Sequence, residues 1–449
     1  MVPLRRNLRM NIKIKRGLFS GLLFLATSAA AQQRLAVEDI VVLSLEKGYD
    51  VQLSRNLVKS SVTDARNASG LFLPDITLNG SRTWTKQDSR QTLADHSEKD
   101  VSNIKQNGYN ANVQMNWVLF DGLKMFATFK QFREIQGVNE VLLKNQMANT
   151  MASVIGSYHN VVALKQQLRA LNEQISVGEE RIKLAERKLQ VGSGIKTELL
   201  QARLDQNAFK VQALQQEALI VQAKANLNAL SGNQLPDEFD VSDTILLDLH
   251  LTMDEVIDGI ESTNPALIAA RGNIEVAKYN LKARRGDRMP IVSLTSSYNL
   301  NRNESNQAQN PYSPIATKTN GYNYGFTAQW FILNNFILKN ANQLAVINLQ
   351  RQELLYEQAR VAALAGVKIA YSNYDNARKT LAIEEENIRL ARENVSILLE
   401  TFKRGATTFI ELRTAQQSMV DAYNRLTTAR YNAKVSETEL LRLKGALLR

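Results

Sequence analysis

Residues 107–122 read NGYNANVQMNWVLFDG, and this stretch decides the fold. From Tyr109 to Trp117, aromatic or aliphatic side chains alternate with Asn and Gln without a break, and Leu119 continues the apolar side. Alternation of this kind over about 10 residues, with aromatic residues near the ends, is typical of the wall of a transmembrane β-barrel. A soluble sheet with one wet face is the alternative, but the lack of charge on the polar face favours the barrel.

The same pattern recurs 213 residues further along the chain, where Asn107–Asn110 is repeated as Asn320–Asn323. Other landmarks keep this offset: Trp117 and Trp330, Gly192 and Gly405, Glu198 and Glu411, Ala202 and Ala415, and Gly232 and Gly445. One offset held over so many positions indicates a duplicated domain, because the period is far longer than that of a solenoid repeat.

Each half is expected to contain a short helix, a pair of strands and a long helical hairpin. The predicted boundaries are a first structural repeat at 32–232 with its strand pair at 75–120 and hairpin at 122–231, an equatorial segment at 233–263, and a second structural repeat at 264–449 with its strand pair at 290–333 and hairpin at 336–445. The polar stretches 87–106 and 302–319 are interpreted as extracellular loops. The strand after Pro74 follows the pattern less well, because Arg82 falls on its apolar side.

Only four strands of this kind occur in one chain. Four strands cannot enclose a lumen, since barrels made of a single chain start at about 8 strands. An open sheet edge in lipid would also leave backbone groups without hydrogen-bond partners. We therefore expect several chains to share one barrel, and three copies would supply about 12 strands.

From Gly122 to Gln190 the chain has no proline and shows a seven-residue apolar repeat. The repeat positions in the two halves are Val154, Val161, Leu168, Ile175, Ile182 and Leu189, and Val367, Tyr374, Leu381, Ile388, Val395 and Phe402. This is coiled-coil patterning, and nearly 70 residues would give a rod of roughly 100 Å. Because each rod follows directly from a strand, it has to project out of the membrane. The expected fold class is therefore a coiled-coil helical barrel joined to a transmembrane β-barrel.

The first residues carry six basic side chains and no acidic one, followed by an apolar run that ends at Ala29–Ala31. These are the parts of a secretory signal peptide, predicted at 1–31. Without it, 49 basic residues remain against 44 acidic ones, so most of the argument for a nucleic-acid partner disappears. The chain has no cysteine, three widely separated histidines and no motif for phosphate, dinucleotide or zinc chemistry. We expect no enzyme activity, no cofactor and no metal.

The sequence resembles the TolC-like outer-membrane efflux family over nearly the whole chain after the signal peptide. The resemblance is carried by Asn264–Leu267 before the second strand pair, Leu119–Gly122 at the strand-to-helix turn, and Thr197–Ala202 and Glu411–Ala415 near the hairpin tips. It implies a homotrimer in the outer membrane of a Gram-negative bacterium, with a 12-stranded barrel and a 12-helix periplasmic tunnel.

The resemblance also implies a function as the exit duct of a tripartite efflux or type I secretion system. Such a duct docks a periplasmic adaptor (membrane fusion) protein and an inner-membrane pump of the RND or ABC type. A secreted coiled-coil structural or adhesion rod is the alternative function, although a rod needs no amphipathic strand pairs.

The resemblance places the tunnel gate candidates at Glu198, Phe402, Thr407, Glu411 and Thr414. The family gate uses an aromatic residue, a basic residue and two acids near the second tip. At the matching positions this chain has the aromatic Phe402, which lacks a hydroxyl, and one acid, Glu411, but no basic residue. Repeated around a closed tunnel mouth, Glu411 would favour cations. Thr408-x-x-Glu411 is equally well explained as a capping box at the start of a helix.

Two further groups of residues are expected to make contacts. The adaptor-docking tips are Gly192, Ser193, Gly194 and Gly405, although glycine at a tip also fits plain turn geometry. The predicted membrane aromatic belt, at the boundary with outer-membrane lipid, consists of Tyr109, Trp117, Tyr322, Tyr324 and Trp330.

Overall fold

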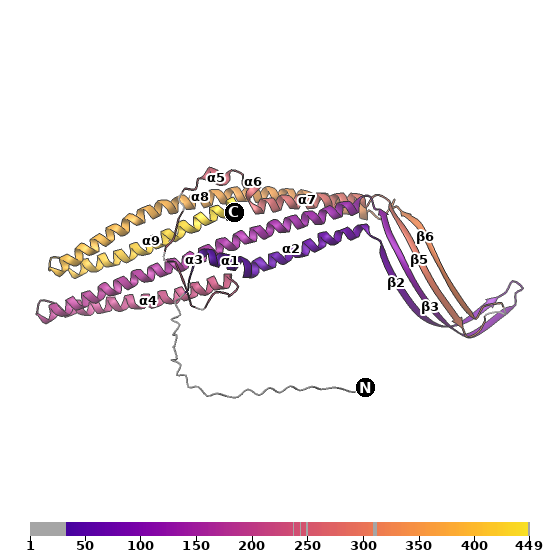
Figure 1. The fold of residues 1–449 in the computed structure, drawn as a ribbon, viewed down its shortest axis with the longest axis horizontal. Coiled ribbons are helices and arrows are strands. Elements are labelled where there is room, and N and C mark those ends of the chain that lie inside the picture. The colour runs from indigo at the N-terminus through magenta and orange to yellow at the C-terminus, as the bar shows by residue number, and fades with distance from the viewer. Residues whose placement is uncertain (1–32, 237, 243, 248–249, 309–311, 448–449) are drawn as a thin grey trace, which may run out of the picture.

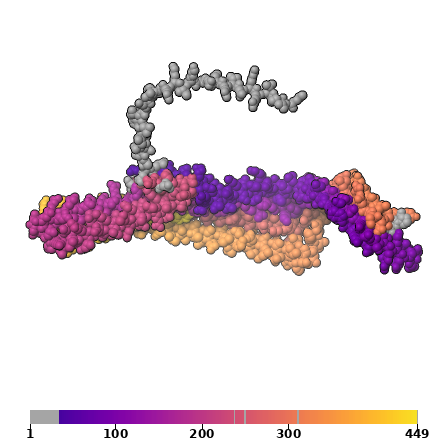
Figure 2. All heavy atoms as spheres, turned by 90° about the horizontal axis from the view of Figure 1, so that it is seen from below, coloured from indigo at the N-terminus to yellow at the C-terminus, as the bar shows by residue number. Residues whose placement is uncertain are grey.

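The chain forms a long bundle of helices that leads into a four-stranded sheet at one end (Figure 1). The structure is a computed structural model, and it describes residues 33–447 except 237, 243, 248–249 and 309–311. The predicted signal peptide at 1–31 lies outside the described residues. Figure 2 shows a narrow, elongated body in which the first and second halves of the chain run alongside each other.

Two helices of 67 residues each form the framework: α3 Lys124–Gln190 and α8 Ile337–Lys403. Each turns back into a shorter antiparallel helix, α4 Lys196–Leu230 or α9 Phe409–Lys444. The remaining helices are α1 Val37–Lys47, α2 Tyr49–Asn67, η1 Ala68–Phe72, α5 Met253–Ile257, α6 Ile260–Thr263 and α7 Pro265–Gly286. Among these described helices, none combines the length and the apolar character needed to cross a membrane.

Each of the two long helices is covered by shorter helices placed end to end. α2 packs on α3 near the sheet and α4 packs on it towards the far end, while α7 and α9 cover α8 in the same way (Figure 1). α3 also contacts α7 and α9, so it joins the two halves of the bundle.

The predicted heptad positions are buried in one half more than in the other. All six positions in α8, from Val367 to Phe402, are buried. In α3, Val154 and Val161 are fully buried, but Leu189 is 37% exposed. The buried positions of α3 towards its far end are instead Ala170, Gln174, Gly178, Arg181 and Ala185. We attribute the difference to Ala170, Gly178 and Ala185, whose small size lets both α4 and α9 pack against this face of α3.

The sheet consists of β2 Asp75–Thr92, β3 Glu98–Phe120, β5 Ile291–Ser305 and β6 Ala316–Gln329. The strands are antiparallel and lie in the order β2-β3-β5-β6, so the central pair joins the two halves of the chain. Within the described residues, β2 and β6 each have one edge without a partner strand.

The strand ends differ from the predicted ones in two places. The stretch 87–106 is largely strand rather than loop, because pairing in the first hairpin continues to Thr92 opposite Glu98, whereas 302–319 is strand only at its two ends, up to Ser305 and from Ala316. Polar contacts such as Arg90 to Asp100, at 2.7 Å, link the strands there in place of apolar alternation. The second pair was expected to reach residue 333, but β6 ends at Gln329 because the chain then turns into α8.

The two turns from strand to helix use different residues for the same geometry. Asp121 Oδ2 accepts a hydrogen bond from the Met125 N–H at 2.9 Å, and Gly122 has φ 70°. A Cβ on Gly122 would lie 2.4 Å from the Gly286 carbonyl oxygen, so only glycine fits. In the second half, Asn334 takes the place of Asp121, and Asn335 takes the left-handed position with φ 54°. Asn tolerates this conformation, so the second turn keeps the geometry without glycine.

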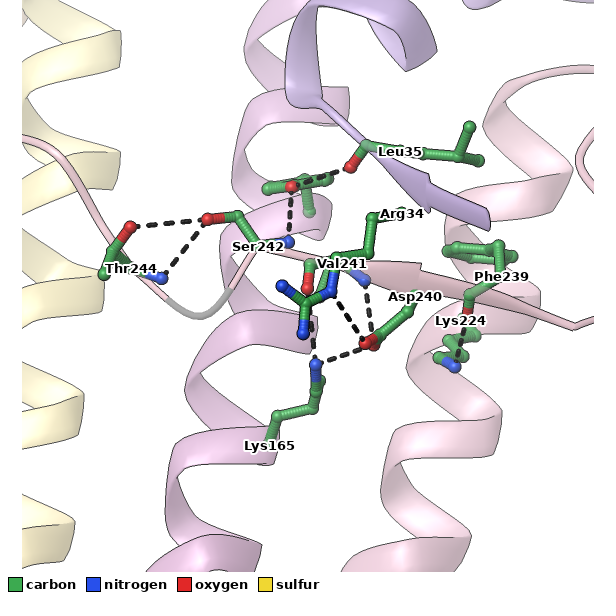
Figure 3. A network of polar contacts seen from close by, with 10 residues as sticks. Arg34, Leu35, Lys165, Lys224, Phe239, Asp240, Val241, Ser242 and Thr244 are labelled. Atoms are coloured by element: carbon green, nitrogen blue, oxygen red, sulfur yellow. Dashed lines mark hydrogen bonds and ion pairs between the residues drawn. The ribbon is translucent and has the colours of Figure 1, made fainter. Parts of the chain in front are cut away.

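The equatorial segment is attached midway along the first hairpin. Its strand β4 Phe239–Val241 pairs in parallel with β1 Gln33–Leu35 at the start of the described chain (Figure 3). Asp240 Oδ1 lies 2.6 Å from Lys165 Nζ on α3. Burial alone would raise the pKa of the Asp240 carboxyl, but the hydrogen bonds from Lys165 and from the Val241 N–H, together with the charges of Lys165 and Lys224, hold it below its usual value.

Tyr158 of α3 completes this attachment from inside the core. Its hydroxyl donates to the Leu35 carbonyl at 3.0 Å and accepts from the Ser242 N–H at 2.9 Å. On α4, Lys224 donates to the Phe239 carbonyl (Figure 3). β1 and β4 are therefore held against α3 and α4 by side chains from both helices.

Candidate tunnel entrance and membrane-facing sheet

Two tight turns form the tips of the helical hairpins, at the end of the bundle opposite the sheet (Figure 1). Gly192 and Gly405 both have φ 76°, which favours glycine. The Ser193 N–H donates to the Lys188 carbonyl at 2.9 Å, and the equivalent bond in the second tip runs from Ala406 to Thr401. Both tips thus have the glycine-terminated geometry typical of helix ends.

The two tips are joined by a contact between their last helical turns. Lys188 Nζ of α3 lies 4.1 Å from the centre of the Phe402 ring on α8 and donates to the Phe402 carbonyl at 3.4 Å. Phe402 is 5% exposed. This gate candidate therefore packs between hairpins in the single chain instead of projecting into solvent.

Glu411 forms the capping box that its spacing predicted. Its N–H donates to Thr408 Oγ1 at 3.3 Å, and its Oε2 accepts from the Thr408 N–H at 3.0 Å. The Thr407 hydroxyl also donates to Oε2. These bonds, that from Thr407 first, hold the pKa of the Glu411 carboxyl below its usual value, so it is ionised at neutral pH.

The remaining gate candidates lie apart from this group. Thr414 bonds back to the Ile410 carbonyl of its own helix at 3.0 Å. Glu198 is half-buried in the first turn of α4, where Ile195 at the N-cap provides no side-chain acceptor. Of the predicted gate residues, the structure brings together only Thr407 and Glu411.

A buried polar cluster lies behind the tips, at positions that the sequence did not indicate. Arg181 of α3 is 3% exposed and donates to Asp205 Oδ2 at 3.1 Å and to Gln416 Oε1 at 2.6 Å. Its guanidinium also lies 4.5 Å from the Phe409 ring centre. Asp205 is shared with Arg413, at 3.1 Å. The entrance cluster, Arg181, Asp205, Phe409, Arg413 and Gln416, thus connects α3, α4 and α9.

Some buried polar atoms in and next to the entrance cluster have no hydrogen-bond partner among the described residues. Arg181 Nε and both side-chain amide atoms of Gln174, about two turns away on the same face of α3, are buried without such partners in the part of the chain that the structure describes. Burial lowers the pKa of the Arg181 guanidinium, while the bond to Asp205 acts in the opposite direction. A cavity of 370 Å³ borders the cluster between α4 and α9. An interface with unpaired polar atoms and adjacent space is less stable than a fully packed one.

The polar face of the sheet carries a ladder of amide and hydroxyl side chains. Asn79 donates to Asn112 at 3.0 Å across β2 and β3, and Asn110 donates to Asn301 at 2.5 Å across β3 and β5. Ser297 continues the ladder to Asn323 of β6. Neutral side chains that bond to one another across strands are suited to line a water-filled lumen.

The five predicted belt residues do not form one row. Trp117 and Trp330 lie at the helix end of the sheet, where their indole N–H groups donate to backbone carbonyls of Phe72 and Arg288. Tyr322 and Tyr324 stack with ring centres 6.4 Å apart, further along β6. Tyr109 lies nearest the far end of the sheet and is in register with Arg82 and Arg302.

Comparison with known proteins assigns this chain to a protein family. The model of the outer membrane efflux protein family matches residues 41–233 and 256–446. The chain belongs to this family. The two matched stretches fall on either side of residues 234–255, which include β4 and the first residues of α5.

Members of the outer membrane efflux protein family are similar to this chain over most of its length. Outer membrane efflux protein BepC of Brucella suis is 22% identical, over 75% of this chain and 72% of its own. Alkaline protease secretion protein AprF of Pseudomonas aeruginosa is 20% identical, over 91% and 86%. The fold is that of the Campylobacter jejuni CmeC outer membrane channel, with a TM-score of 0.76, 15% identity and coverage of 97% and 94%.

Family membership decides between the two functions that the sequence left open. The interpretation as an outer-membrane efflux channel protein is confirmed over that of a secreted coiled-coil rod. The predicted fold is confirmed at the level of long helices combined with an antiparallel sheet.

Proposed function

We propose that three copies of this chain close into one channel, with a 12-stranded barrel in the outer membrane and a 12-helix tunnel in the periplasm. The observation that carries the proposal is the four-stranded sheet, in which β2 and β6 each have one edge with no partner strand in the described part of the chain. In lipid these edges would leave a row of unpaired backbone groups, each costing several kcal/mol. Joining β6 of one copy to β2 of the next would pair both.

Apolar seams on two helices support the same assembly. On α4 and α8, large apolar side chains recur at coiled-coil spacing yet lie open in the single chain. They are Leu200, Leu204, Val211, Leu214 and Val221 on α4, and Ile369, Ile383, Leu390 and Ile397 on α8. The two helices belong to opposite halves of the bundle (Figure 1). A ring of copies in which α4 packs on a neighbour's α8 would cover both seams.

The equal spacing of the two halves supports a duplicated origin. α3 and α8 have the same length and lie 213 residues apart, the offset of the sequence landmarks. Two matching repeats, at 32–232 and 264–449, would give the tunnel a regular wall of alternating hairpins. The segment 233–263 would form the equatorial connection between them.

Such a channel would be the passive exit duct of a tripartite efflux or type I secretion system. Gly192, Ser193, Gly194 and Gly405 would receive the periplasmic adaptor, and an inner-membrane pump of the RND or ABC type would drive transport. The similar proteins include both an outer membrane efflux protein and an alkaline protease secretion protein, so both kinds of system are compatible with this proposal.

The entrance would be gated where the tips meet. Glu411, ionised and placed near a tip, would form a ring of three negative charges, and its capping bonds would hold the carboxylate in place. The entrance cluster would hold α9 against α3 and α4 in the closed state. Arg181 Nε, which has no hydrogen-bond partner among the described residues, and the adjacent cavity are features of an interface that is able to separate.

The assembly is tested by fractionation and by channel recording. The full chain, expressed with its own leader, should be found in the outer membrane, run as a heat-sensitive trimer in mild detergent and conduct ions in planar bilayers. A monomer in detergent, or release from membranes by salt alone, would disprove the proposal.

A further inference from the structure

A row of basic side chains crosses the apolar face of the sheet. Arg82 of β2 is directly opposite Tyr109 of β3, which is opposite Arg302 of β5, which is opposite Lys318 of β6. Residues directly opposite in antiparallel strands point to the same side of a sheet. All four therefore share the face of the apolar residues, and in a barrel that face meets lipid.

The height of this row places it at the edge of the hydrocarbon. The apolar face of β3 runs from Leu119 near the helices to Tyr109, which is about 33 Å along the strand. With the usual tilt of 35–45°, this is about 25 Å along the barrel axis and equals the apolar band of an outer-membrane barrel. Charge on the lipid face costs about 0–1 kcal/mol near an interface but about 2–4 kcal/mol at the centre.

More basic residues follow in the next rows away from the helices. Lys86 of β2 is directly opposite Lys105 of β3, and both are exposed. Like charges directly opposite repel each other in a sheet, so a bound anion between them would be stabilising. Glu304 is the acidic residue in these rows and pairs with Arg302 at 2.5 Å. The cationic rows are defined here as Arg82, Lys86, Lys105, Arg302 and Lys318.

The guanidinium of Arg82 is held in place by aromatic rings. It lies 4.6 Å from the ring centre of Trp84 and 4.9 Å from that of Tyr109. Aromatic rings with a polar tip are typical of the membrane interface, and an oriented guanidinium is able to bind phosphate through two parallel hydrogen bonds.

We propose that the cationic rows bind the phosphate groups of an anionic lipid in the outer leaflet, whose acyl chains cover the apolar rows below. The proposal rests on the proposed function, because the helices have to be periplasmic for this edge to face outwards. A lipid fits better than a soluble anion, because the basic residues continue directly from the apolar band. The cationic rows also match the negative charge of lipid phosphates, because each chain contributes five basic residues to these rows and one acidic residue, Glu304.

The test uses the intact channel in detergent and a lipid A that carries two phosphates, with its dephosphorylated form for comparison. The variant is Arg82→Gln with Lys318→Gln, which leaves the Arg302 to Glu304 pair in place. The matched control is Lys210→Gln with Lys368→Gln, which removes the same charge from exposed positions on α4 and α8. Binding is measured by native mass spectrometry at increasing lipid concentrations.

We expect the unaltered channel to bind the phosphorylated lipid at least tenfold more tightly than the dephosphorylated one, and this preference to weaken with salt. The Arg82 and Lys318 variant should lose the preference, and the control should keep it. Equal binding of both lipids by the unaltered channel, or full preference in the variant, would overturn the proposal. Conductance in planar bilayers separates the two ideas, because a conducting trimer without lipid preference contradicts only the lipid site.

Discussion

Arg181 on α3 and Asp205 on α4 are bonded at 3.1 Å, and Ser193 at the hairpin tip lies midway between them in sequence. Residues equally far from the turn of an antiparallel hairpin meet across it, so the pair crosses the hairpin directly. Arg181 also reaches Gln416 on the other hairpin. One buried cation therefore ties both hairpins together behind the entrance.

Replacing Asp205 should weaken the entrance more than any other single change there. Asp205→Asn leaves the guanidinium of Arg181 buried without its counter-charge, and we expect a loss of about 3 kcal/mol. Unfolding of the protein in denaturant measures the loss, and protease cleavage near the tips should become faster. Arg413→Gln is the control, because the Arg413 side chain is 54% exposed and its pair should contribute less than about 1 kcal/mol. Equal effects of the two variants would contradict a buried clamp.

Charge and capping at Glu411 are separable by two substitutions. Glu411→Gln keeps a capping side chain but removes the charge, so cation selectivity should fall in single-channel recordings. Thr408→Ala keeps the charge and removes the cap, which should cost about 1 kcal/mol of stability without changing selectivity. Unchanged selectivity in Glu411→Gln would leave the residue with a capping role only.

The stability of the helical bundle should fall in mild acid because of His159. The side chain is 5% exposed, and burial holds its pKa below the usual value. The unfolded chain then binds the proton more readily than the folded one. This contribution is complete above about pH 6.5 and is lost as the pH falls through the lowered pKa. Melting curves between pH 8 and 5 should show a smaller acid effect in His159→Gln, and parallel curves would refute it.

A larger residue at the tip of the second hairpin should fit the fold but interfere with the proposed adaptor contact. A Cβ on Gly405 would meet nothing within 4 Å, and Asn accepts the left-handed conformation. Gly405→Asn should therefore keep the proposed trimer and weaken the proposed contact with the adaptor, measured by crosslinking in cells. Gly366→Asn, an equally open position within α8, should leave the crosslink unchanged. Normal crosslinking in both variants would place docking elsewhere.

The sequence predicted the parts of this fold that depend on periodicity. The alternation from Tyr109 to Leu119 identified a strand, and the heptads from Val367 to Phe402 identified buried helix positions. Polar residues near Arg90 were interpreted as a loop, because cross-strand pairing with Asp100 leaves no apolar period. Hairpin symmetry would have predicted the buried ion pair. Arg181 and Asp205 are a basic and an acidic residue at equal distances from the glycine turn, so they have to meet across the hairpin.

The candidate site was predictable only where local chemistry decides it. Glu411 caps its helix because Thr408 lies three residues before it, a relation visible in the sequence. The burial of Arg181 depends on α9, which is contributed by residues more than 200 positions later. No local pattern contains that information. The same holds for the basic row, because Arg82, Arg302 and Lys318 become neighbours only through the order of the strands.

The equal lengths of α3 and α8 restrict how this molecule is able to change in evolution. A seven-residue insertion in one rod alone would carry its turn about 10 Å beyond the other, at 1.5 Å per residue. The contact between Lys188 and Phe402 would then be lost, and the tips would no longer end at one level. A longer or shorter version of this chain therefore has to gain or lose residues in both halves at once. An insertion or deletion in α3 is tolerated only together with a matching one in α8.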